Sequence, residues 1–113
     1  MALQITEREK RDIVILDLAG DLVSPDCGTL TGRVKELLAS GKKKILLNLK
    51  DVARTDSLGL GSLAASYVSA QRQEAVVKLF SPNDRVGEAI QATRLDYVID
   101  TYSREKDALA SFD

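Results

Sequence analysis

The chain has 113 residues, a length suited to one domain over residues 1–113 and too short for two hydrophobic cores. Its 44% hydrophobic and 29% charged residues indicate a globular protein, and no apolar run approaches a membrane span. The 16 basic and 17 acidic residues are interspersed, which argues against a nucleic-acid-binding face. The first residues lack the apolar core of a secretory signal, so we expect a cytoplasmic protein.

The chain is poor in the side chains that metal sites and hydrolytic sites use. Histidine is absent, which removes the commonest metal ligand and the commonest general base at neutral pH. Cys27 is the one cysteine, so an intrachain disulfide is impossible, and we interpret it as an inert thiol. We therefore expect no metal, no cofactor and no enzymatic activity.

The first third of the chain predicts a hairpin followed by a helix. Alternating apolar and polar residues predict a strand over residues 3–7, and a polar turn then leads to a more buried strand over residues 13–18. Ser24 and Pro25 resemble a hydroxyl cap and a first helical proline. Gly41 would end that helix, whose inward face consists of Leu30, Val34, Leu37 and Leu38.

The middle of the chain predicts a central strand and a second helix. The strand covers residues 44–49, and residues 50–53 form a short connection. The helix begins between Ser57 and Leu60. Its apolar spacing predicts an inward face made of Leu60, Leu63, Ala64, Tyr67 and Val68.

The last third continues the alternation of strands and helices. We expect a strand over residues 76–80, a helix opened by residues 81–83, a short strand over residues 97–101, and a final helix capped by Ser103. This order predicts an α/β fold with a mostly parallel central sheet, an antiparallel N-terminal hairpin strand and about four helices.

Residues 55–59 connect a predicted strand to a predicted helix, the place where sites gather in open α/β sheets. The free N–H groups and the dipole of the helix would favour a phosphate on Ser57. The alternative is mechanical: Asp56 or Ser57 caps the helix, while Gly59 and Gly61 allow close packing on the sheet. The spacing fits neither a P-loop nor a dinucleotide fingerprint. Taken alone, the turn favours the mechanical interpretation.

Three longer stretches carry a family resemblance: AGDLVSPDCGTL, DVARTDSLGLGSL and LFSPNDRVGEAIQATRLDYVIDTY. Together they resemble the STAS domains of bacterial anti-sigma factor antagonists, and the similarity covers essentially the whole chain. The centre of the family pattern is an acid, a serine, a further hydroxyl residue and the sequence Gly-Leu-Gly. This chain has Asp56, Ser57 and, from Gly59, the same Gly-Leu-Gly, with Leu58 in place of the second hydroxyl residue.

The resemblance implies a partner-switching role in transcription regulation. The unphosphorylated antagonist would bind an anti-sigma factor that is also a serine kinase, and would thereby release the sigma factor. The kinase would phosphorylate Ser57, and a protein phosphatase would reverse the modification. Asp56, Leu58 and Gly59 would flank this phosphoacceptor, and Asp21 and Ser24 belong to the neighbouring loop.

Two departures from the family pattern leave other functions open. Leu58 stands where a serine or threonine is usual, and Val23 stands where the family often has an acid or a hydroxyl. Leu58 either packs locally or contacts a partner, and an apolar rim suits a permanent interface. The alternatives are therefore a constitutive STAS accessory subunit of an ATP-binding-cassette transporter and a scaffold subunit of a sensory assembly.

Overall fold

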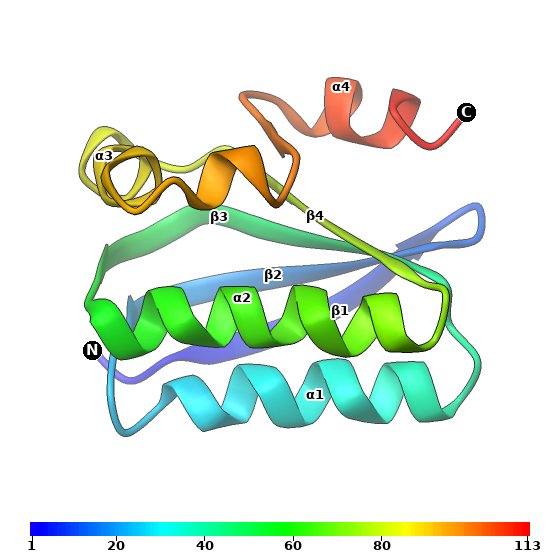
Figure 1. Cartoon of the computed structure of the whole chain (residues 1–113), viewed down its shortest axis with the longest axis horizontal. Coiled ribbons are helices and arrows are strands. Elements are labelled where there is room, and N and C mark those ends of the chain that lie inside the picture. The colour runs from blue at the N-terminus through cyan, green and yellow to red at the C-terminus, as the bar shows by residue number, and fades with distance from the viewer.

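Five strands form one sheet in the order β1-β2-β3-β4-β5 in the computed structural model, which describes residues 1–113 (Figure 1). The first pair is antiparallel and the other three pairs are parallel. The predicted hairpin and the mostly parallel sheet are therefore confirmed. The strands are β1 (Gln4–Lys10), β2 (Ile13–Leu22), β3 (Lys44–Thr55), β4 (Val76–Phe80) and β5 (Thr101–Tyr102).

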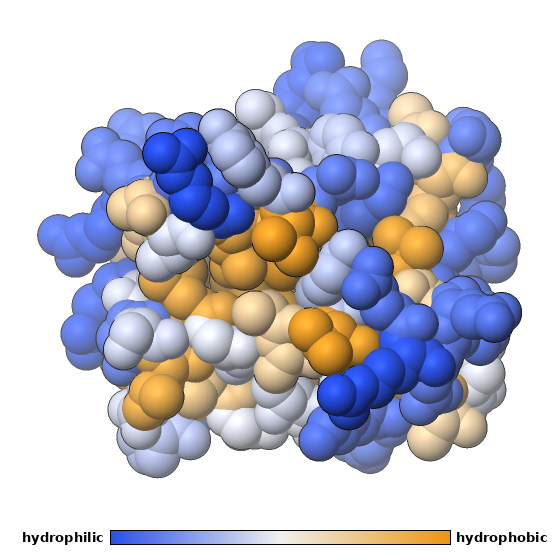
Figure 2. Space-filling view, in the orientation of Figure 1, coloured by the Kyte–Doolittle hydropathy of each residue, from blue (hydrophilic) through white to orange (hydrophobic).

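Four α-helices cover the two faces of the sheet, in agreement with the sequence. They are α1 (Cys27–Ala39), α2 (Ser57–Arg72), α3 (Asp84–Ala92) and α4 (Glu105–Ala110), and a short 3₁₀ helix, η1 (Leu95–Tyr97), follows α3. Figure 1 shows α1 and α2 side by side on one face and α4 on the opposite side of the sheet. From the same direction, Figure 2 shows apolar and weakly polar residues over much of α2, with strongly hydrophilic residues mainly towards the edges. No helix combines the length and the apolar composition that crossing a bilayer requires.

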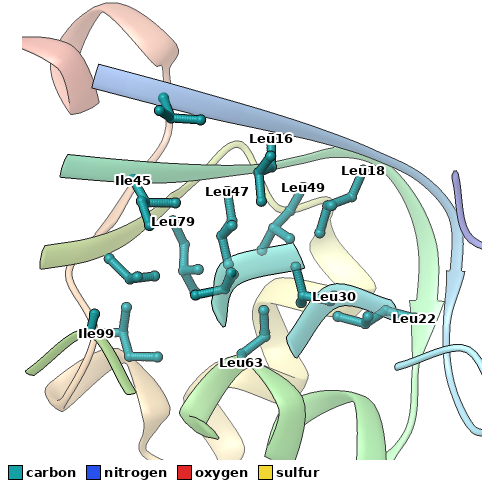
Figure 3. Packing of buried hydrophobic residues seen from close by; sticks show 14 of the residues in the cluster. Leu16, Leu18, Leu22, Leu30, Ile45, Leu47, Leu49, Leu63, Leu79 and Ile99 are labelled. Carbon is teal, nitrogen blue, oxygen red and sulfur yellow. The ribbon is translucent and has the colours of Figure 1, made fainter. Parts of the chain in front are cut away.

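Successive strand residues point to opposite faces of the sheet, and apolar residues of the strands form a cluster on each face. On one face, residues such as Leu16, Leu47 and Leu63 belong to a cluster of 20 buried residues that α1, α2 and α3 cover (Figure 3). On the other face, a cluster of five buried residues includes Phe80 of β4 and Ala108 of α4. Consecutive apolar residues in β2 therefore point alternately into these two clusters, which lie on opposite faces of one sheet.

Several predicted boundaries are wrong for local reasons. Strand β3 continues to Thr55, so residues 50–53 extend the strand, with Val52 buried. Helix α1 begins at Cys27 and not at Ser24, because residues 23–26 form a turn in which the Asp26 N–H donates to the Val23 carbonyl oxygen at 2.8 Å. The signal at residues 81–83 is confirmed, since the Asn83 side chain accepts from the Val86 N–H at 2.8 Å.

The prediction of a strand over residues 97–101 is wrong except at residue 101. The backbone turns at Arg94, which has a positive φ of 61°, and then forms η1. Strand pairing is limited to Thr101 and Tyr102. Ser103 is not the cap of the final helix, because α4 begins at Glu105 and Arg104 holds the cap position without a side-chain hydrogen bond.

The inward face of α2 differs from the prediction. The buried residues are Gly59, Ser62, Leu63, Ser66 and Ala70, while Val68 is 45% exposed. Leu60 and Tyr67 are partly buried against the core. Two serine hydroxyls can be buried here because each donates to a carbonyl oxygen of its own helix, at 2.6 Å and 2.8 Å. The small residues let α2 lie close to the sheet.

Candidate functional site at the start of α2

The carboxyl ends of β2 and β3 lie together at one edge of the sheet. Their register pairs Asp21 with Arg54 and Leu22 with Thr55. The Thr55 hydroxyl donates to the Leu22 carbonyl oxygen at 2.8 Å, which joins the two strand ends. The loop after β2 and the turn before α2 therefore meet, as expected for a parallel pair of strands.

Asp56 joins the start of α2 to the β2–α1 loop. It is the N-cap of α2, and its Oδ1 atom accepts from the Gly59 N–H at 2.8 Å. Its Oδ2 atom accepts from the backbone N–H of Ser24 at 3.3 Å. One carboxylate thus satisfies a free N–H of the helix start and also binds the β2–α1 loop. The mechanical role left open between Asp56 and Ser57 belongs to Asp56.

Gly59 is required by the close approach of α2 to β2. A Cβ atom at this position would overlap the carbonyl oxygen of Leu22 and the hydroxyl oxygen of Thr55. The predicted packing role of Gly59 is confirmed. The same prediction is wrong for Gly61, because a Cβ atom there meets nothing within 4 Å.

Ser57 is the first residue of α2 and is exposed. Its hydroxyl makes no hydrogen bond within the protein. The side chain that caps the helix is that of Asp56. The next side chain, Leu58, is 58% exposed and is therefore not packed locally. The site consequently presents a free hydroxyl beside an apolar side chain, at the positive end of a helix dipole.

The two residues expected from the β2–α1 loop have different roles. Asp21 is only 8% exposed and forms ion pairs with the Met1 amine at 2.9 Å and with Arg54 at 3.3 Å. The hydrogen bond from the amine, together with the Arg54 charge, lowers the pKa of Asp21. Ser24 is exposed and joins the site through its backbone N–H, not through its hydroxyl.

Sequence reasoning missed Leu22 and Arg54 as parts of this site, whereas Thr55 lies in the predicted turn over residues 55–59. Leu22 contributes a backbone carbonyl oxygen, which carries no signal in the sequence. The predicted strand ends at residue 49, so Arg54 and Thr55 fall outside it, although both belong to β3. The sequence carries no regular alternation that marks residues 50–55 as a strand, because the inward residues Leu49, Val52 and Thr55 are three apart where the pairing with β2 is irregular.

A cavity with a volume of about 650 Å³ lies on the α4 side of the sheet, away from the start of α2. Arg8 is central to its lining: its guanidinium binds Asp17 at 2.7 Å and also binds Glu105. The Asn48 amide donates to Asp17 at 2.7 Å. Arg8, Asp17, Asn48 and Glu105 thus satisfy one another within the cavity wall.

The comparisons with known proteins agree with this architecture. The family model described as STAS domain matches residues 4–108. The chain belongs to the STAS domain family. A protein of Thermotoga neapolitana named as an anti-sigma factor antagonist is 36% identical over 74 residues, which are 66% of this chain and 66% of that protein. The match therefore spans slightly under two thirds of this curated relative.

Solved structures share the fold over nearly the whole chain. An anti-sigma factor antagonist of Thermotoga maritima has a TM-score of 0.89 at 28% identity, over 95% of this chain and 92% of that one. The Bacillus protein SpoIIAA, in a structure of its phosphorylated form, has a TM-score of 0.72 at 18% identity, over 99% of this STAS domain and 100% of that chain.

Proposed function

We propose that this STAS domain is an anti-sigma factor antagonist that binds a serine-kinase anti-sigma factor and is released when that kinase phosphorylates Ser57. The observation that carries the proposal is the free, exposed hydroxyl at the first residue of α2. Because Asp56 is the cap, modification of Ser57 would remove no hydrogen bond from the fold. The names of the Thermotoga relatives, and the phosphorylated form of SpoIIAA, support the same role.

The switch follows from the charge of the phosphate. Phosphorylation adds about −1.5 to −2 charges at pH 7. At the start of α2 the helix dipole favours this charge by roughly 0.3–1 kcal/mol, so the fold tolerates it. In a protein interface that encloses a neutral hydroxyl, the same charge must be desolvated. Each penalty of about 1.4 kcal/mol weakens binding tenfold. A phosphatase that removes the group would restore binding.

Intact-mass measurement tests the acceptor. The protein is incubated with ATP and, in turn, with each purified serine-kinase anti-sigma factor encoded in the same genome. One phosphate should be added to the wild type and to Ser24→Ala, which removes an exposed hydroxyl of the adjoining loop, but not to Ser57→Ala. No phosphate on the wild type, or equal addition to Ser57→Ala, would contradict the assignment of Ser57.

A constitutive STAS subunit of a transporter is the second candidate, and the 58% exposure of Leu58 favours it. An apolar side chain beside Ser57 suits an interface that is never switched by charge. In that case no kinase would modify Ser57, and the protein would remain bound to an ATPase subunit with or without ATP. The mass measurement therefore separates the two functions.

A further inference from the structure

Charged residues are missing from one continuous part of the surface. The chain is 29% charged, yet residues 57–71 contain no charged side chain, and Arg72 is the first in α2. Residues 27–32, the first turns of α1, contain none either. The two helices lie side by side with their first residues at the same edge (Figure 1), and Figure 2 shows few strongly hydrophilic residues over this region. We call residues 27–32 and 57–70 the uncharged face.

Helix α2 has no charged outer side before Arg72 that would explain its exposure. Leu58, Gly61, Ala65 and Val68 are exposed and follow helical spacing along the outer side. The opposite side, with Ser62 and Ser66, packs against the sheet. A solvated helix of a globular protein normally carries charged residues on its outer side. A helix that lacks charged residues on its outer side is normally buried on both sides.

Three glycines on the uncharged face have no close neighbour that would require a glycine. A Cβ atom added to Gly28, Gly32 or Gly61 meets nothing within 4 Å. Glycine within a helix is unfavourable relative to alanine, and these positions have no internal contact that would compensate. A missing side chain on an outer helix surface allows another backbone to come close. Gly59, in contrast, is explained by its contact with Leu22.

We infer that the uncharged face is the docking surface for the anti-sigma factor, which covers it with an apolar, uncharged segment. The inference rests on the proposed function. The face begins at Ser57, so one bound protein covers both the outer side of α2 and the hydroxyl. Depletion of charge is the composition found at the centre of protein interfaces. The face offers no cation to a nucleic acid or an anionic membrane. A phosphate on Ser57 then introduces a charge at the margin of this surface.

Two substitutions test the surface, using the kinase that phosphorylates Ser57. Gly61→Gln places an uncharged, helix-favouring side chain on the face, and Val68→Lys places a charge there. The matched control is Ala110→Gln, at an exposed position of α4 on the other side of the sheet. Calorimetric titration should show binding weakened at least about tenfold for both variants and unchanged for the control. Thermal melting should show Gly61→Gln at least as stable as the wild type.

The outcomes separate this inference from the proposed function. Binding of both variants within about twofold of the wild type would overturn the docking surface and leave the Ser57 switch in place. If no kinase binds the wild type, the proposed function and the docking surface both fail. If light scattering shows a wild-type dimer that Gly61→Gln dissociates, the uncharged face binds a second copy of the chain and the inference is overturned.

Discussion

Asp56 and Ser57 are neighbours with separate tasks at the start of α2. The Asp56 carboxylate binds the N–H groups of Gly59 and Ser24, while the Ser57 hydroxyl binds no protein group. This division keeps the proposed phosphoacceptor independent of the helix cap. A modification at Ser57 can therefore change what the surface binds without unfolding the helix that presents it.

Asp56→Ala should destabilise the protein by about 1–2 kcal/mol, because it removes the helix cap and the hydrogen bond to the β2–α1 loop. Urea denaturation followed by circular dichroism measures the change. Ser57→Ala is the matched control and should remain within about 0.5 kcal/mol of the wild type. Equal loss of stability in the two variants would show that Asp56 is not the cap in solution.

The two glycines of the motif should respond in opposite directions to alanine. Gly59→Ala forces a Cβ atom into the Leu22 carbonyl oxygen, a backbone atom that cannot move aside alone. We expect a loss of about 3 kcal/mol or more, or failure to fold. Gly61→Ala faces open space and should stabilise the protein by about 0.5–1 kcal/mol through helix propensity. Urea denaturation of the two variants measures both changes. If the slope of the free energy of unfolding against urea concentration stays that of the wild type, the midpoint should fall for Gly59→Ala and rise for Gly61→Ala.

Ser57→Asp should weaken binding to the kinase at least about tenfold, because a carboxylate imitates part of the phosphate charge. Ser57→Ala should bind like the wild type, since it leaves the surface neutral. Surface plasmon resonance with the immobilised kinase in the presence of ADP measures both affinities. Unchanged affinity of the aspartate variant would argue that charge at Ser57 does not control the complex.

Among the elements, the strands and helices with strong local signals could be predicted from the sequence. The cap at Asn83 and the positive φ of 92° at Gly41 agree with the signals at those residues. Residues 97–101 could not be predicted correctly, because an apolar run of that length fits a strand or a turn, and packing decides between them. The start of α1 was missed for a similar reason, since Ser24 and Pro25 fit a turn as well as a cap.

The side of α2 that packs on the sheet could not be predicted from the apolar spacing. The apolar spacing selects a face through Leu60 and Val68, but the helix packs through Ser62 and Ser66. A serine that satisfies its own hydroxyl within the helix behaves as a small core residue, and this is not visible in the sequence. The rotation leaves Val68 exposed, and it is one reason why α2 presents an apolar outer side.

Across the whole molecule, ionic contacts connect the first strand to the last helix. Glu105 of α4 binds Arg8, and it also binds Lys10 at 2.7 Å; Arg11 binds Asp113 at 3.0 Å. These contacts hold α4 over the small apolar cluster that contains Phe80 and Ala108. The C-terminal helix is only six residues long, so its position depends on such contacts and not on its own stability.

This network predicts how stability depends on pH. The hydrogen bond from Arg8 lowers the pKa of Glu105 to about 2, and Lys10 acts in the same direction. A carboxylate with a lowered pKa stabilises the fold above its unfolded-state pKa, and that contribution disappears as the pH falls through the folded-state value. Glu105→Gln should therefore cost roughly 1–3 kcal/mol at about pH 7 and less than half as much near pH 3. Urea denaturation at the two pH values measures this difference.

Glu88→Gln, at an exposed position of α3 that forms no ion pair, should cost little at either pH. A penalty for Glu105→Gln that stays constant between the two pH values would mean that the carboxylate charge does not hold α4 in place.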